Sequence, residues 1–270
     1  MNSREISRSI GQSPIKRTLA YLIIRLTTLW EWYIRRGLFD ILATYGDSFS
    51  FLDAGSGMGQ RAIEVSKKYP GSRVSAIELD SEQVRDCTLF VQKIGKNNIR
   101  FIHGDLSDLN EKERFDVVLC AHILEHIVDD VGVLRMLYRA IKCDGYLLVY
   151  VPTSEQRVLP SLGRTIYKMT KRAKAVYPHD HVRYYTSHEL SKKLKLTGFE
   201  VEKAIVTYGP YGRLAYDIVT SIQYCPIFKI AFPFYFILIH PFVLLLMLAD
   251  FNKSNHEGNG LMITAIKRSV

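Results

Sequence analysis

The chain has 270 residues, of which 47% are hydrophobic and 23% charged, a composition that excludes an intrinsically disordered protein. Its net charge of +9 is unevenly distributed. Residues 1–36 hold seven basic and two acidic side chains, residues 157–183 hold seven and one, and the rest of the chain sums to −2. A near-neutral core with two basic segments argues against a generally basic nucleic-acid-binding protein. The four cysteines have no short spacing, so they indicate neither a zinc site nor a disulfide framework, but reduced thiols of a cytosolic protein.

The N-terminal segment predicts an amphipathic helix. The stretch "KRTLAYLIIRLTTLWEWYIRR" holds Trp30 and Trp32 between basic flanks, which is typical of a helix at a membrane interface. Arg25 interrupts its apolar run, so the stretch does not fit a secretory signal. We expect residues 1–46 to form a helical cap and residues 47–270 to form the main domain.

From about residue 48 to residue 152, strand and helix patterns alternate. This order predicts an α/β fold with a doubly wound, parallel sheet, whose ligands bind at the carboxyl ends of the strands. The predicted strands are 49–53, 73–79, 98–104, 115–121 and 145–151, and the predicted helices are 57–68, 81–93 and 127–141. Further along, the pattern predicts a helix at 187–197 and strands at 200–207 and 261–267.

The stretch "SFLDAGSGMGQ" places three glycines directly after the first strand. Gly55, Gly57 and Gly59 permit a sharp turn before a helix, where backbone N–H groups and the helix dipole meet. Glu78 ends the second predicted strand, where a carboxylate can accept both ribose hydroxyls. The spacing differs from the G-x-G-x-x-G pattern of dinucleotide-binding enzymes, and Asp53 suits a ligand with cationic groups.

Five stretches in order now resemble the class I S-adenosylmethionine-dependent methyltransferases, from a small-molecule branch similar to the ubiquinone pathway. They are "FLDAGSGMG", "AIELD", "FIHGDLSDL", "FDVVLCAHILEHIVD" and "LYRAIKCDGYLLVYVPT". Cys143-Asp144-Gly145 stands where the family usually has Pro-Gly-Gly, a departure that concerns a turn. The resemblance implies a Rossmann-like, mostly parallel seven-stranded sheet with the last strand antiparallel. It also implies S-adenosylmethionine as cofactor, with contacts at Asp53, Gly55, Gly57, Gly59, Glu78, Asp105 and Leu106.

Candidate catalytic residues cluster in "HILEH". His122, Glu125 and His126 share one face if the turn after the fourth strand is helical, and His181 joins them if its loop crosses the strand ends. One interpretation gives these residues a general-base or acceptor-binding role. A second is a divalent Mg, Mn or Zn site, because the motif is similar to the Glu-x-x-Glu-His metal site of ubiquinone-pathway and small-RNA O-methyltransferases. A third is that His126 packs structurally and His122 lines the pocket.

The basic segment 157–183 ends in "HDHVR", where the resemblance places His181 and Arg183 toward the acceptor. We expect it to be a lid that contacts an anionic acceptor. The alternative is a solvated helical face.

An apolar insertion at 226–256 precedes the last strand. Residues 230–249 carry no charge and are long enough to span a bilayer. A single crossing would separate two strands of one sheet, and Pro233 and Pro241 interrupt a helix, so a re-entrant or interfacial membrane segment is favoured. The alternative is a buried helical cap or a dimer surface.

The sequence therefore predicts methyl transfer to a small lipophilic or lipid-linked acceptor, such as a quinone precursor, a polyprenyl-linked sugar or another lipid. The predicted location is the inner face of a membrane, with peripheral attachment. The alternative is a non-catalytic S-adenosylmethionine-binding scaffold at a membrane. A nucleic-acid acceptor is not favoured, since the sequence has neither an Asn-Pro-Pro-Tyr-like motif nor an obvious base-stacking module.

Overall fold

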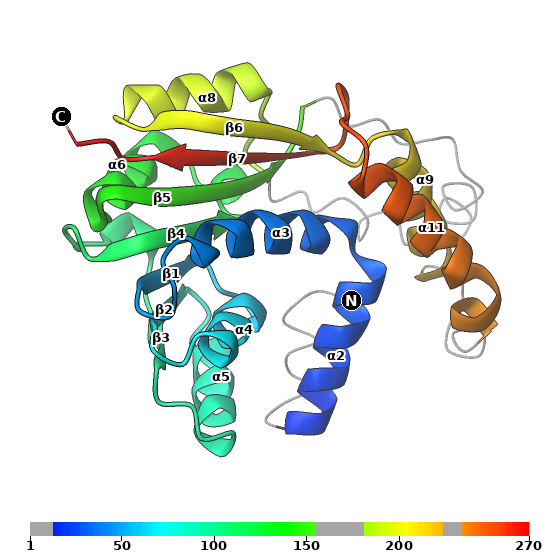
Figure 1. Cartoon of the computed structure of the whole chain (residues 1–270), viewed down its shortest axis with the longest axis horizontal. Coiled ribbons are helices and arrows are strands. Elements are labelled where there is room, and N and C mark those ends of the chain that lie inside the picture. Colours follow the sequence, from blue (N-terminus) through cyan, green and yellow to red (C-terminus); the bar gives the residue numbers. More distant parts are fainter. Residues whose placement is uncertain (1–12, 155–180, 224–233, 270) are drawn as a thin grey trace.

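The computed structural model describes residues 13–154, 181–223 and 234–269 of the chain. Its centre is a seven-stranded sheet in the order β3-β2-β1-β4-β5-β7-β6 (Figure 1). β7 pairs antiparallel with both of its neighbours, and every other pairing is parallel. The fold predicted from the sequence, with its antiparallel last strand, is confirmed.

The elements agree closely with the sequence pattern. The strands are β1 (Ser50–Ala54), β2 (Arg73–Glu78), β3 (Ile99–His103), β4 (Phe115–Ala121), β5 (Ile141–Pro152), β6 (Glu200–Thr207) and β7 (Gly260–Ile266). The helices are α2 (Pro14–Thr27), α3 (Leu29–Ala43), α4 (Gln60–Lys68), α5 (Ser81–Lys93), α6 (Asp130–Ala140), α8 (Ser187–Leu196), α9 (Pro210–Gln223) and α11 (His240–Phe251). Two short 3₁₀ turns, η1 (Leu106–Asp108) and η2 (Leu124–His126), follow β3 and β4.

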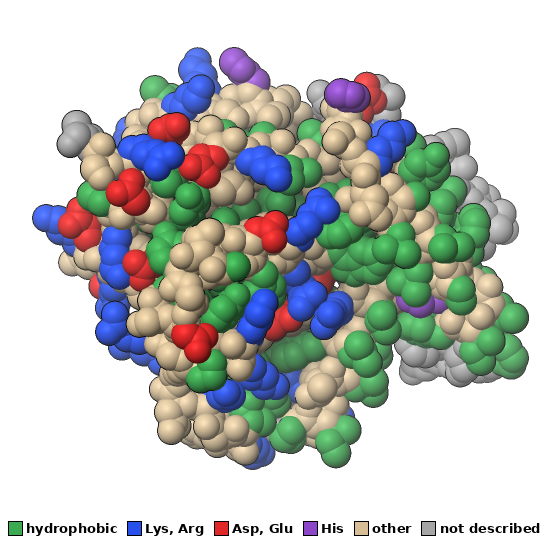
Figure 2. Space-filling view, viewed as in Figure 1, with side chains coloured by type: hydrophobic (Ala, Val, Ile, Leu, Met, Phe, Trp, Pro, Cys, Tyr) green, Lys and Arg blue, Asp and Glu red, His purple; other side chains and the backbone are tan. Residues whose placement is uncertain are grey.

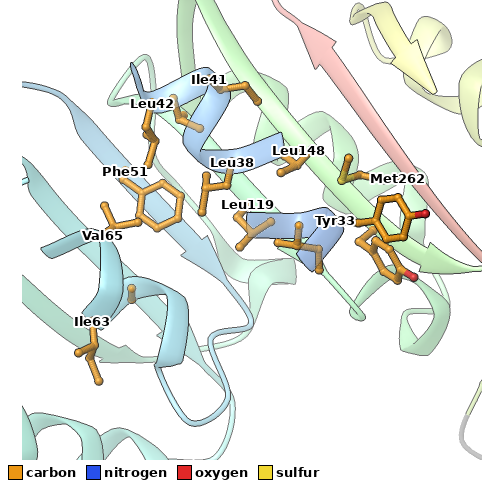
Figure 3. Close-up of a cluster of buried hydrophobic side chains, with 14 of the residues drawn as sticks. Tyr33, Leu38, Ile41, Leu42, Phe51, Ile63, Val65, Leu119, Leu148 and Met262 are labelled. Atoms are coloured by element: carbon orange, nitrogen blue, oxygen red, sulfur yellow. The ribbon is translucent and has the colours of Figure 1, made fainter. Parts of the chain in front are cut away.

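Both faces of the central strands β1, β4 and β5 are covered, which explains why these strands are apolar at most positions. Phe51 and Leu119 point into the core beneath α3 and α4 (Figure 3). Their neighbours Leu52 and Val118 belong to the core on the opposite face. Side chains alternate along a strand, so adjacent apolar residues serve both cores.

The N-terminal cap differs from the single helix predicted. The structure divides it at Thr28, whose backbone is extended, with φ −126° and ψ 107°. α3 packs on the sheet, with Tyr33 and Leu38 in the core, whereas α2 leaves the sheet and extends past α4 (Figure 1). The two tryptophans are in α3 and have different surroundings, because Trp30 contacts His122 and Trp32 contacts Phe251.

The connection from β6 to β7 contains α9 and, within the apolar insertion, α11; the two helices lie side by side (Figure 1). A π-helical turn, η4 (Tyr235–Ile239), precedes α11, and Pro241 lies in the first turn of α11, where its missing N–H costs little. His240, Val243, Met247 and Asp250 form the buried face of α11. Asp250 accepts hydrogen bonds from the Gly212 N–H at 2.9 Å and the Tyr33 hydroxyl at 3.1 Å, which fixes α11 to α9 and α3.

Within the described ranges, no helix is both long enough and apolar enough to traverse a bilayer. Most of the predicted basic lid, residues 157–180, and residues 226–233 of the apolar insertion lie outside those ranges.

Candidate active site

The glycine turn connects β1 to α4 at the carboxyl edge of the sheet. Gly55, Gly57 and Gly59 have φ values of 79°, 52° and 72°, a region that only glycine adopts at low cost. A Cβ at Gly55 would lie 2.1 Å from the Ile123 Cδ1 atom, and one at Gly59 would lie 2.6 Å from the Phe101 ring. Backbone conformation and close approach both require glycine here.

Glu78 lies beside this turn at the end of β2. Its carboxylate accepts hydrogen bonds from the Gly57 N–H at 2.7 Å and the Asp80 N–H at 3.0 Å. The backbone N–H of Gly104 bonds to the Glu78 carbonyl, which brings the β3 end and Asp105 to the same edge. Asp105 is exposed and caps η1 by accepting from the Ser107 N–H at 2.8 Å, whereas Leu106 is buried.

Asp53 is buried beneath the turn, where its carboxylate accepts a hydrogen bond from the Ala62 N–H at 3.2 Å. Burial raises the pKa of Asp53 to about 6, although the nearby Arg61 opposes this shift. Arg61 itself pairs with the fully buried Glu31 of α3. Asp53, which we expect to face a cationic ligand, therefore also stabilises the first turn of α4.

The helix α2 contacts the glycine turn through Arg17 and Tyr21. The fully buried Arg17 guanidinium donates to the Met58 carbonyl at 2.9 Å, and the Tyr21 hydroxyl donates to the same oxygen at 2.6 Å. Arg17 lies in the stretch whose basic residues the sequence pattern indicates only as flanks of an interfacial helix. The i, i+4 spacing of Arg17 and Tyr21 on one helix face is the signal that could have identified them.

His122 follows β4 with a left-handed backbone, φ 60°, which is uncommon for a residue with a side chain and typical of functional sites. Its Nδ1 lies 3.3 Å from the Oε1 of the fully buried Glu125. Its ring is 4.8 Å from the Trp30 ring and 4.9 Å from the Tyr150 ring, measured between centroids. The buried His122 Nε2 has no hydrogen-bond partner among the described residues. Trp30 and Tyr150 are site residues that the sequence analysis did not assign.

His126 and His181 lie together beside Glu125. Their ring centroids lie 4.8 Å apart, and one ligand atom from each of Glu125, His126 and His181 lies within 4.8 Å of the others. The expected grouping of His122 with His126 is therefore divided, with Glu125 between two histidine environments. Arg183, expected to face the acceptor, instead pairs with Asp130 at the start of α6.

The parallel sheet with an antiparallel β7, the glycine turn and the carboxylate at the end of β2 define a class I S-adenosylmethionine-binding domain. Residues 25–204 match the family described as the methyltransferase domain, so more than half of the chain is matched and the chain belongs to that family. It is an S-adenosylmethionine-dependent methyltransferase.

Curated relatives agree with this assignment. The chain is 27% identical over 164 residues to the ubiquinone biosynthesis O-methyltransferase of Pseudomonas entomophila, a match that covers 59% of this chain and 68% of the relative. It is 28% identical over 138 residues to the (S)-coclaurine N-methyltransferase of Thalictrum flavum subsp. glaucum, which covers 51% and 38%. Among solved structures, a phosphoethanolamine N-methyltransferase 2 of Haemonchus contortus bound to S-adenosylhomocysteine has a TM-score of 0.56 at 18% identity, with coverage of 86% and 52%. At this identity, the similarity to the solved structure is evidence for the fold alone.

Proposed function

We propose that this methyltransferase acts on a small lipophilic or lipid-linked acceptor, such as a quinone precursor, a polyprenyl-linked sugar or another lipid, at the surface of a membrane. The observation that carries the proposal is the apolar exposure of α11 and η4. Ile237, Leu238 and Leu245 are 71%, 72% and 64% exposed. Because the insertion joins β6 to β7 at the carboxyl edge of the sheet, this surface lies at the same edge as the glycine turn.

We further propose that Asp53, Gly55, Gly57, Gly59, Glu78, Asp105 and Leu106 form the cofactor site. Glu78 would accept the ribose hydroxyls, with Asp105 and Leu106 at the adenine. The short distance between the Glu78 carboxylate and Gly57 supports this arrangement, together with the space beside Gly57, where an added Cβ would meet only Gln83 at 3.9 Å.

Methyl transfer is an in-line displacement on an activated donor, so a base is needed only to remove the acceptor proton. His122 is our candidate for that base. With Nδ1–H donated to Glu125, the Nε2 of His122 would be free to take a proton, and the carboxylate would stabilise the imidazolium that forms. Trp30 and Tyr150, whose rings pack against that of His122, would fix the orientation of the imidazole.

A divalent metal at Glu125, His126 and His181 is the second proposal for this site. Two imidazoles and one carboxylate are a donor set that Zn or Mn accepts, and the residues present fit such an ion. An ion bound there would act as a Lewis acid on the acceptor oxygen. His126 and His181 would then hold the ion, and Glu125 would be shared with His122.

The test is methylation of membrane extract with labelled S-adenosylmethionine, followed by organic extraction of the product. His122→Ala should reduce turnover at least 100-fold, the usual contribution of acid–base catalysis, with cofactor affinity unchanged, and His126→Ala should do so only if a metal takes part. His188→Ala, on the exposed side of α8, is the matched control. Chelator should abolish activity only if a metal takes part. Label that stays in the aqueous phase would contradict a lipophilic acceptor.

Attachment is proposed to be peripheral, at the inner, cytoplasmic face of the membrane. Ile237→Gln, Leu238→Gln and Leu245→Gln combined should move the protein from the membrane pellet to the supernatant. Leu79→Gln, Val128→Gln and Leu196→Gln combined remove equally exposed apolar side chains elsewhere and should not. Equal sedimentation of both variants would contradict this attachment.

A further inference from the structure

A basic cavity opens where α2, α3, α4 and the end of α11 meet, outside the site described above. Its volume is about 660 Å³. The residues that line it are Arg25, Leu26, Trp32, Arg35, Arg36, Phe39, Lys68 and Phe251. Four of these eight are cationic and none is acidic, so the cavity favours an anion.

Three of the four cations keep their charge uncompensated. Arg35 is neutralised by Glu64, whose two oxygens each lie 3.0 Å from the Arg35 Nε. In the described part of the chain, Arg25, Arg36 and Lys68 form no ion pair with a carboxylate. A group with two negative oxygens could therefore be bound by charge-assisted hydrogen bonds without displacing a carboxylate.

Aromatic rings hold two of these cations in place. The Arg36 guanidinium lies 3.9 Å from the centroid of Phe251, and the Lys68 ammonium lies 4.2 Å from that of Phe39. Contacts with ring faces fix the positions of the cations while leaving most of their N–H donors available. Trp32, which packs edge-on against Phe251, completes this wall.

Apolar side chains continue from the cavity along two helices. Leu22 precedes Arg25 by one turn of α2, and Leu248 precedes Phe251 by one turn of α11; they are 49% and 44% exposed. Figure 2 shows basic side chains gathered in the middle of this face, with hydrophobic ones over α11 to the right and over α2 below. A soluble phosphate compound would not need apolar side chains beside the cavity. A lipid has both an anionic phosphate for the cations and acyl chains for the apolar side chains.

We infer that this cavity binds the phosphate headgroup of an anionic membrane lipid, while the exposed faces of α2 and α11 contact the acyl region. The inference deepens the membrane attachment proposed above and rests on it. It assigns Arg25, Arg36 and Lys68 to headgroup binding and so fixes which face of the domain is turned to the bilayer. The ligand class is a lipid phosphate diester, for which phosphatidylglycerol serves as the probe.

The experiment compares vesicle binding of the full chain on pure phosphatidylcholine and on phosphatidylcholine with phosphatidylglycerol. The test variant combines Arg25→Gln, Arg36→Gln and Lys68→Gln. The matched control combines Arg73→Gln, Arg100→Gln and Lys195→Gln, three exposed cations of β2, β3 and α8 that do not line the cavity. S-adenosylmethionine binding in solution, measured for each variant, verifies that it is folded.

Each surface cation contributes about 1 kcal/mol, or about fivefold, on an anionic membrane. The test variant should lose about 100-fold in affinity for anionic vesicles and little for neutral ones, and the control variant should lose clearly less. Equal losses of affinity for anionic vesicles in the two variants would overturn the inference, since they would indicate that only the net charge of the protein determines binding. Competition by millimolar glycerol phosphate as strong as that by lipid would also overturn it, by indicating a soluble ligand. Failure of wild type to bind either vesicle would instead refute the proposed membrane attachment.

Discussion

Replacing Gly55 by alanine tests whether the glycine turn is required by backbone conformation alone or also by close approach. The residue has φ +79°, and an added Cβ would lie 2.1 Å from the Ile123 Cδ1 and 2.5 Å from its Cγ1. Gly95 is a matched control, because its φ is +65° and nothing lies within 4 Å of an added Cβ. Both substitutions place an alanine in a left-handed backbone conformation, but only the alanine at Gly55 would collide with Ile123.

A left-handed backbone costs an alanine about 1–2 kcal/mol, which is the whole cost expected for Gly95→Ala. Gly55→Ala should add the cost of an overpacked site, about 1–3 kcal/mol, because the Ile123 side chain must move. The Ile123 Cβ lies 3.8 Å from the added Cβ, an ordinary contact. In an Ile123→Ala background, the cost of Gly55→Ala should therefore fall to that of Gly95→Ala.

Urea unfolding of the four variants and wild type gives the free energies of unfolding, and the double variant gives the coupling energy. We expect a coupling of about 1–3 kcal/mol in the stabilising direction. S-adenosylmethionine titration should show loss of binding in Gly55→Ala and retained binding in Gly95→Ala. If Gly55→Ala destabilises no more than Gly95→Ala, and Ile123→Ala brings no rescue, the close approach is not what requires glycine.

Three further outcomes are expected. Glu78→Ala should weaken S-adenosylmethionine binding by about 1.5–3 kcal/mol in calorimetry, the range for hydrogen bonds to a charged group, whereas Glu82→Ala should not. Because burial raises the folded-state pKa of Asp53 to about 6, the folded chain keeps a proton that the unfolded chain loses near pH 4. Stability should therefore fall by up to about 3 kcal/mol as the pH rises from 4 to 6, and Asp53→Asn should remove that part of the pH dependence in unfolding measured at both ends. Arg17→Met should lower stability by about 1.5–3 kcal/mol in chemical unfolding, with the exposed Lys16→Met as the control that stays near wild type.

The centre of the sheet could be predicted from the sequence because its inner strands are buried on both faces. Runs such as "FDVVLCA" are almost wholly apolar, and the helices between them favour a parallel order, so β4 matches the predicted 115–121. The edge strand β6 matches 200–207 although most of its residues are partly or fully exposed. The glycine turn could be predicted for a related reason, since few conformations other than a tight turn use three alternate glycines.

The surroundings of the site could not be predicted in the same way. Arg17 reaches the glycine turn because Thr28 separates α2 from α3, and a single extended residue leaves no periodic signal in an apolar stretch. Arg183 pairs with Asp130, which is 53 positions away along the chain, so the spacing of the sequence could not identify this partner. Such pairings are properties of the tertiary structure and have no local pattern.

The break at Thr28 also explains how one short segment can serve both the cofactor site and the outer surface. α3 is held to the sheet by core residues, so α2 is free to lie across the glycine turn, where Arg17 and Tyr21 bond to the Met58 carbonyl. The opposite face of α2 leaves Leu19 and Leu22 about half exposed. A continuous helix would have carried these residues along the direction of α3, away from the turn. The apolar residues that suggest an interfacial helix and the polar residues that touch the turn are therefore two faces of one helix, and the extended residue between α2 and α3 lets both faces be used.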